Sequence, residues 1–364
     1  MSANTSPLAP VLRGEGLGVR GCVCAQAQCN PSPSPQPLSP EGRGALSIVI
    51  PSHNRPDLLR ACLAGVTRHA PAGTEILVID DGSPGGSVSA AASEVAHVRC
   101  LRSPRRRGFC AAANAGIVAA TAPIVELLND DTEVEAGWAA AALGHFSDPR
   151  VAAVAPLVLR WAAAGEAAPI DSAGDRYFRG GVAGKRGHGE PVGPAYLRPC
   201  RVFGASASSA FYRRDLLLRV GAFPERFGAY FEDVDLSFRL HRAGGEVVFE
   251  PASRVRHRVS ASHGRPRHRL LEQQSRNEEL VFWRNLPAAE LARSLPLHLA
   301  VLAAKAWRRW GEGNLAPFLA GRLSVLAQLP AIVRQRRLLR ELGPQDDVTR
   351  WGVERHFWGT TRKR

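Results

Sequence analysis

The stretch Glu75-Ile76-Leu77-Val78-Ile79-Asp80-Asp81-Gly82-Ser83 joins an apolar run to two adjacent carboxylates and a turn. The run 76–79 is apolar and largely β-branched, which predicts a buried strand that ends at the acid pair. The same arrangement recurs twice, with Asp130-Asp131 after the run 124–129 and Glu232-Asp233 after Tyr230-Phe231. Adjacent carboxylates repel one another and are costly to bury. We therefore interpret the three pairs as groups that bind a cation, hold a sugar hydroxyl or take up a proton.

The residues around these pairs alternate between strand and helix patterns. Short apolar runs predict strands at 46–50, 75–79, 98–101 and 123–128. Apolar residues at helical spacing predict helices that begin near Pro56 and at Phe109. This alternation predicts an α/β fold with a doubly wound, parallel sheet, in which ligands bind outside the carboxyl ends of the strands. The first two acid pairs fall at those ends.

The second half of the chain contains further strand and helix patterns. We expect strands at 151–161, 203–212 and 246–249, helices at 138–146, 216–220 and 233–243, and a glycine-rich loop at 171–193. From residue 286 onward the pattern is helical and rich in arginine. The sequence thus divides into a proline-rich segment over 1–44 that we expect to be disordered, an α/β domain over 45–285 and a helical extension over 286–364.

The composition restricts the class of protein. With 364 residues, of which 45% are hydrophobic, the chain can bury the core of one large domain or of two smaller ones. Its seven cysteines match neither a disulfide framework nor a zinc site, which predicts a reducing, cytoplasmic compartment. The net charge of +14 suits phosphate-bearing substrates, nucleic acid or anionic lipid surfaces.

The helical extension leaves two interpretations open. The sequence contains no uninterrupted apolar run of about 18 residues, the length that predicts a membrane-spanning helix, and no signal peptide pattern. Leucine and tryptophan are interspersed with arginine over 290–342, which predicts amphipathic helices. These helices either contact the inner face of the cell membrane peripherally or pack on the α/β domain or on a second subunit.

Several motifs, in this order and spacing, resemble the family 2 glycosyltransferases, and most of all their rhamnosyltransferase-like branch. The motifs are SIVIPSHNR (47–55), IDDGS (79–83), GF (108–109) with NAG (114–116), LLNDDT (127–132), VGAFPERF (220–227) and FEDVDLSFRL (231–240). The resemblance extends over residues 46–285. It implies a GT-A fold, which is a doubly wound mixed sheet flanked by helices. It also implies inverting transfer of a sugar from a nucleotide-diphosphate donor to a glycan or lipid-linked acceptor, in cell-surface polysaccharide synthesis, with Mg²⁺ or Mn²⁺ as cofactor.

The resemblance implies metal-binding roles for one acid pair and a histidine. Asp131 binds the cation that bridges the diphosphate oxygens, and Asp130 lies near the ribose or the metal. His257 is an additional metal ligand, for which His263 is the alternative. A turn capped by Thr132 would explain an isolated Asn-Asp-Asp sequence as well, but this one occurs together with the other motifs.

The resemblance further implies the residues that contact the donor. They are Pro51, His53, Asn54, Asp81, Gly108, Asn114, Asn129 and Asp130. Asp81 hydrogen-bonds the nucleobase or the ribose, while Asp80 holds the loop. His53 either stacks on the base or is merely solvated, and the sequence leaves both open.

The third acid pair is implied to be catalytic. An inverting reaction requires one carboxylate that takes the proton of the acceptor hydroxyl, and Asp233 matches the family's general base. Glu232 either raises the basicity of Asp233 or binds the acceptor. Both acids are also favoured simply by the positive end of the helix that we expect to begin there.

A second class of function is a non-catalytic protein that binds a nucleotide or nucleic acid with its α/β sheet and basic surface. Three carboxylate pairs at strand ends would repel a phosphate backbone, so we expect no nucleic-acid partner. The sequence leaves open which sugar and nucleotide are used, the acceptor and linkage, the oligomeric state, and whether residues 1–44 belong to the native protein.

Overall fold

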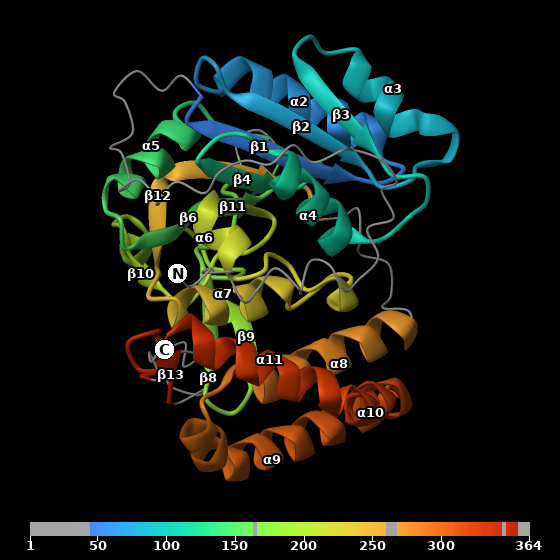
Figure 1. Ribbon diagram of the computed structural model, residues 1–364, viewed down its shortest axis with the longest axis vertical. Coiled ribbons are helices and arrows are strands. Elements are labelled where there is room, and N and C mark those ends of the chain that lie inside the picture. The colour runs from blue at the N-terminus through green and yellow to red at the C-terminus, as the bar shows by residue number, and fades with distance from the viewer. Residues whose placement is uncertain (1–43, 163–165, 260–267, 344–346, 356–364) are drawn as a thin grey trace, which may run out of the picture.

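The computed structural model describes residues 44–162, 166–259, 268–343 and 347–355 (Figure 1). The expectations for the proline-rich segment over 1–43 and for His263 lie outside the described residues.

A large mixed sheet forms the centre of the molecule. Its strand order is β10-β12-β6-β11-β4-β1-β2-β3, with β5 paired to β12 and β7 paired to β6. The strands are β1 (Leu46–Ser52), β2 (Glu75–Asp80), β3 (Val98–Arg102), β4 (Ile124–Leu128), β5 (Thr132–Val134), β6 (Val151–Arg160), β7 (Ile170–Ser172), β10 (Cys200–Val202), β11 (Ser209–Arg213) and β12 (Glu246–His257). The four strands predicted in the first half of the chain are thus confirmed.

The half of the sheet that contains β1 to β4 is parallel, as the alternation of strands and helices predicts. β1 lies between β2 and β4 and is parallel to both, and β11 then joins β4 in the antiparallel direction. Both faces of β1 are buried, because Val49 faces one apolar cluster while Ile48 and Ile50 face the other. The helix that follows β3 packs closely on β1. A Cβ at Gly116 would lie 2.2 Å from a methyl carbon of Val49, so only glycine fits there.

Helices cover the sheet and form one end of the molecule (Figure 1). They are α2 (Pro56–His69), α3 (Ser87–Ser93), α4 (Phe109–Ala119), α5 (Trp138–Gly144), α6 (Arg214–Arg219), α7 (Glu232–Arg242), α8 (His268–Asn285), α9 (Ala288–Gly311), α10 (Leu315–Ser324) and α11 (Leu329–Leu342). The C-terminal part of the chain shares a core with the sheet domain, since Ile332 of α11 and Trp351, which follows that helix, belong to the same apolar cluster as Phe238 of α7.

Three element predictions in the second half of the chain were wrong in extent. The expected glycine-rich loop contains β7 and a hairpin of β8 (Asp175–Phe178) and β9 (Val182–Lys185), to which β13 (Val353–Glu354) pairs. The strand expected at 203–212 begins only at Ser209. β12 continues to His257 instead of ending at Phe249, because beyond an irregularity it resumes pairing with β6 and β5. This longer strand carries His257 to the end of the sheet.

One stretch of the described residues, Leu315–Leu342, is long and apolar enough to cross a membrane by length and composition alone, which the sequence analysis did not predict. It consists of α10, a 3₁₀ turn (Leu326–Gln328) and α11. Of its most apolar 18 residues, 28% are buried. Arg322 within it is an ion-pair partner of Glu279 on α8 at 2.6 Å. This pairing indicates a segment that packs on α8.

A buried carboxyl in the central strand makes the stability of the fold depend on pH. Glu126 of β4 is fully buried and accepts hydrogen bonds from Trp138 and Ser209. Burial raises its pKa from 4.5 to about 8, although these hydrogen bonds oppose the shift. Between the two values the unfolded chain releases a proton that the folded chain keeps. The free energy of unfolding therefore falls as pH rises through that window.

We expect Glu126→Gln to flatten this dependence, because the amide cannot ionise in either state. Urea unfolding of the variant and of the parent protein, measured between about pH 4.5 and 8, should show a smaller loss of stability in the variant. Glu166→Gln, at an exposed position, serves as the control and should follow the parent. Equal slopes for Glu126→Gln and the parent would contradict the prediction.

Candidate active site

The acid pair after β4 lies where the sequence predicts, but its two members have different surroundings. Asp130 is fully buried and accepts a hydrogen bond from Ser52 at 2.6 Å, and Arg55 lies 2.6 Å from its other oxygen. Burial raises the pKa of Asp130 to about 6, although the charge of Arg55 opposes this shift. Asp131 lines a pocket, and Arg55 reaches it as well at 3.3 Å.

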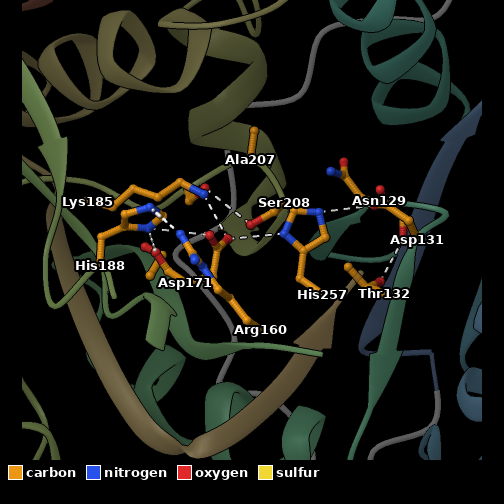
Figure 2. Close-up of polar contacts among 12 residues, drawn as sticks. Asn129, Asp131, Thr132, Arg160, Asp171, Lys185, His188, Ala207, Ser208 and His257 are labelled. Carbon is orange, nitrogen blue, oxygen red and sulfur yellow. Dashed lines mark hydrogen bonds and ion pairs between the residues drawn. The ribbon is translucent and has the colours of Figure 1, made fainter. Parts of the chain in front are cut away.

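A row of hydrogen bonds extends from Asp131 across the end of the sheet (Figure 2). Nε2 of His257 lies 3.1 Å from Asp131, and its Nδ1 lies 3.1 Å from Asp171 of β7. Lys185 of β9 donates to the same oxygen of Asp171 at 2.8 Å. The row therefore connects residues from four parts of the sheet region that are distant in sequence.

Electrostatics fix the charge of this row. Burial disfavours the imidazolium, but the hydrogen bonds to Asp131 and Asp171 outweigh it and raise the pKa of His257 to about 9. Burial likewise opposes ionisation of both acids, yet the bond to His257 holds the pKa of Asp131 and of Asp171 below the usual range. The imidazolium thus donates from both nitrogens at neutral pH.

The third acid pair belongs to a second cluster. Asp233 accepts hydrogen bonds from the N–H groups of Ala207 at 3.1 Å and Val234 at 2.9 Å. Glu232 and Asp175 are buried, and each has one carboxyl oxygen without a partner among the described residues. Burial and the charge of Asp233 raise the pKa of both well above the usual value, and burial also raises the pKa of Asp233. With its two N–H donors, Asp233 is the group best placed to carry the negative charge.

Both clusters line one pocket of about 450 Å³, which we call the acidic pocket. Of the residues predicted from the sequence, it contains Pro51, Asn129, Asp131, Glu232, Asp233 and His257. The fold therefore brings the predicted metal ligands and the predicted base to a single cavity. Asp131 follows β4 and His257 ends β12, whereas Glu232 and Asp233 begin α7.

The pair Asp80-Asp81 lies beside this pocket and organises a loop. Asp80 accepts from Ser83 and Ser89 and so holds the turn after β2, as predicted. Each oxygen of Asp81 accepts one backbone N–H, from Arg107 at 2.7 Å and from Gly108 at 2.8 Å. A carboxylate oxygen has two lone pairs, so one acceptor position remains on each. The loop is tight, because a Cβ at Gly82 would lie 2.4 Å from the backbone of Arg105.

Other predicted donor contacts are placed away from the acidic pocket. The amide of Asn114 pairs with both the N–H and the carbonyl of Phe223, at 2.9 and 2.8 Å, so it joins α4 to the segment before α7. His53 lies 2.9 Å from the carbonyl oxygen of Asp81, and Asn54 is exposed with a φ of 54°. These contacts explain the residue types without a ligand.

Sequence reasoning missed four charged residues of the site. Arg55, Asp175 and Lys185 line the acidic pocket, and Asp171 fixes His257. Arg55 is the last residue of the SIVIPSHNR motif (47–55), but the resemblance implies no role for it. The spacing Asp171-x-x-x-Asp175 within a glycine-rich stretch was the available signal for the two acids.

The two predicted metal ligands suit a cation whose remaining ligands are water or substrate oxygens. No group of three or more His, Cys, Asp or Glu suited to a metal occurs in the part of the chain that the structure describes. Asp131 offers a hard oxygen at the pocket wall, and Nε2 of His257 becomes a second ligand when a cation displaces the proton that it shares with Asp131. Mg²⁺ and Mn²⁺ are commonly held by one or two protein groups, with water and substrate phosphate as the other ligands.

Comparisons with known proteins agree with the motifs. Residues 47–220 match the family model described as glycosyl transferase family 2. The pre-mycofactocin glycosyltransferase of Mycobacterium tuberculosis is 31% identical over 217 residues, which are 58% of this chain and 42% of that protein. The N-acetylglucosaminyl-diphospho-decaprenol L-rhamnosyltransferase of the same organism is 29% identical over 243 residues, which are 60% of this chain and 78% of that protein. The chain thus spans less than half the length of the first relative.

The fold has a counterpart among solved structures. A crystal structure of GalNAc-T7 with UDP, GalNAc and Mn²⁺ matches with a TM-score of 0.55 and 20% sequence identity, over 66% of this chain and 48% of that one. At this identity the likeness concerns the fold alone. It confirms the GT-A fold that the motifs imply.

We expect Asp171→Asn to lower the pKa of His257 from about 9, because the variant removes one of the two carboxylates that hold the imidazolium. A histidine NMR titration measures this directly. Glu246→Gln removes the same charge at the other end of β12 and should leave the titration of His257 unchanged. An unaltered His257 titration in Asp171→Asn would show that the Nδ1 contact does not control its charge.

Proposed function

Because the chain belongs to glycosyltransferase family 2, we propose that it transfers a sugar from a nucleotide-diphosphate donor to an acceptor hydroxyl with inversion at the anomeric carbon. The observation that carries this proposal is the acidic pocket itself. It combines Asp131 and His257 with a separate, partly buried carboxylate, Asp233. A leaving diphosphate and an attacking hydroxyl need these two kinds of group at one reaction centre.

The donor side of the pocket is the end of the parallel half of the sheet. Asp131 and His257 would hold Mg²⁺ or Mn²⁺, which neutralises the negative charge that develops on the leaving diphosphate. Asp171 orients His257 through Nδ1, and each oxygen of Asp81 keeps one lone pair that can accept a hydrogen bond from the nucleoside. Arg55 neutralises the acid pair before the donor arrives, since it contacts Asp130 and Asp131.

On the acceptor side, Asp233 takes the proton of the attacking hydroxyl. Its backbone hydrogen bonds fix the orientation of the carboxylate, and its position at the first turn of α7 makes it rigid. Burial strengthens it as a base, because burial raises the cost of its negative charge. Lys185 in the same wall limits that effect.

The substrates follow from chemistry and from the relatives. The relative that the chain covers to 78% is named as a rhamnosyltransferase that acts on a diphospho-decaprenol acceptor. We therefore propose a deoxyhexose such as rhamnose as the sugar and a lipid-linked glycan as the acceptor, in cell-envelope polysaccharide synthesis. A cytoplasmic enzyme with such an acceptor works at the inner face of the cell membrane.

The C-terminal helices offer a surface for that membrane, which we call the apolar end. Its exposed apolar side chains are Leu297, Leu299, Trp307, Trp310, Leu319, Leu323, Leu326, Leu329 and Val333, from α9, α10, α11 and the turn between the last two. Trp307 and Trp310 are 72% and 62% exposed. Exposed tryptophan beside arginine, as in Arg308 and Arg309, is typical of helices that rest on anionic lipid.

We expect Asp233→Asn to lower kcat by roughly 100- to 10,000-fold, the usual contribution of a general base. The amide keeps the shape of the carboxylate, so binding of the nucleotide-sugar donor in the presence of Mn²⁺ should persist. A screen of nucleotide sugars by thermal shift identifies the donor, after which transfer is followed by release of the nucleoside diphosphate. Asp57→Asn, at an exposed position, is the control. Transfer at the parent rate by Asp233→Asn would refute its assignment as the base.

We expect Trp307→Ser combined with Trp310→Ser to weaken co-sedimentation with vesicles of phosphatidylcholine and phosphatidylglycerol by about tenfold or more, since each indole loses its apolar contact with lipid. Val118→Ser removes an exposed apolar side chain from α4 and should bind like the parent. If the double variant sediments as the parent does, the apolar end does not face a membrane.

A further inference from the structure

A second pocket lies at the junction of four helices, far from the acidic pocket. Its volume is about 360 Å³, and we call it the arginine pocket. It is lined by the end of α7, the end of α8, the first turn of α9 and the second half of α11. α7 begins with Glu232 at the acidic pocket and ends with Arg242 here. At about 1.5 Å per residue, the two sites lie roughly 15 Å apart along that helix.

Positive charge dominates the arginine pocket. Five arginines line it, namely Arg242, Arg284, Arg293, Arg336 and Arg340, and Glu290 is the one acid among the described residues of its wall. Glu290 is already shared between Arg179 at 2.5 Å and Arg293 at 2.6 Å. Arg284 is balanced by Asp235 at 3.4 Å.

Two guanidinium groups on α11, those of Arg336 and Arg340, are not paired with an acid in the described part of the chain. Arg336 donates through Nη1 to the carbonyl oxygens of Trp283 and Leu286, both at 2.8 Å, which fixes the group and leaves Nε and Nη2 for another acceptor. Burial and the nearby charge of Arg340 lower the pKa of Arg336, the direction expected where cations are crowded together.

The first turn of α9 adds further donors. α9 has 24 residues, and Pro287 at its N-cap cannot supply a capping side chain. Ala288 and Ala289 are the first two residues of α9, so their N–H groups have no carbonyl acceptor within the helix. Both residues line the pocket. Free N–H groups at the positive end of a long helix bind anions, and planar guanidinium groups bind phosphate oxygens in pairs.

We propose that the arginine pocket binds a phosphate-bearing anion, either a phosphate monoester or a diphosphate, at a site separate from the acidic pocket. The proposal rests on Arg336, Arg340 and the first turn of α9, and it does not depend on sugar transfer. The anion has two sources with the same chemistry, the headgroup of an anionic lipid and a soluble phosphate compound.

The test uses the full-length chain in EDTA, so that no metal draws phosphate into the acidic pocket. Isothermal titration with inorganic phosphate and with pyrophosphate measures the soluble source, and co-sedimentation with phosphatidylcholine vesicles that contain phosphatidic acid measures the lipid source. Arg336→Gln and Arg340→Gln are compared with Arg337→Gln, which removes an equal charge from an exposed position on α11 outside the pocket. Arg340→Gln disturbs no contact of the fold that the structure describes.

We expect saturable binding in at least one of the two assays, weakened about tenfold by Arg336→Gln and by Arg340→Gln and unchanged by Arg337→Gln. Binding in the titration assigns the site to soluble phosphate, while binding to the vesicles alone assigns it to a lipid headgroup. No binding in either assay, or an equal loss in Arg340→Gln and Arg337→Gln, would overturn the proposal, since the latter result reflects net charge only.

Discussion

The hydrogen-bonded row Asp131–His257–Asp171 is the interaction on which the rest of the site depends. It joins the end of β4, the end of β12 and the start of β7, three strands that are remote in sequence. Burial disfavours the ionised form of Asp131 and of Asp171, and the hydrogen bonds to the imidazolium between them outweigh this effect. The row thereby fixes the wall of the acidic pocket before any ligand binds. Lys185 and Arg55 extend the alternation of charge at its two ends.

The second acidic cluster follows the opposite logic. No cation lies in hydrogen-bond contact with Asp175, Glu232 or Asp233 among the described residues, so burial raises all three pKa values. Such a cluster holds fewer negative charges than it has carboxyls. One wall of the pocket thus contains Asp131, which neighbouring cations keep ionised. The other wall contains Asp175, Glu232 and Asp233, whose pKa values are raised. The proposed transfer would use both states, one beside the leaving diphosphate and the other at the acceptor hydroxyl.

The C-terminal helices have one side that packs on the sheet domain and another that is exposed. Ile332 of α11 and Trp351, which follows that helix, complete the core, and Arg242 at the end of α7 donates to the carbonyl oxygen of Leu339 on α11. The outer faces of these helices carry exposed leucine and tryptophan. The division predicted at residue 286 is therefore a change of sequence pattern within a continuous packed structure. The faces of these helices that pack on the domain thus differ from the exposed apolar faces on which the proposed membrane contact rests.

Local signals in the sequence predict the parallel half of the sheet and the acid pairs at its strand ends, because apolar runs, turns and adjacent carboxylates are read from neighbouring residues. The family resemblance also predicts Asp131, Asp233 and His257 as site residues. Tertiary structure alone decided which of the predicted residues meet. Asn114 pairs with Phe223 and stays out of the pocket. Asp171 on β7 and Asp175 and Lys185 on the β8–β9 hairpin, by contrast, belong to the site although the sequence predicts a loop there. Contacts between distant strands depend on register and burial, and no local pattern encodes them.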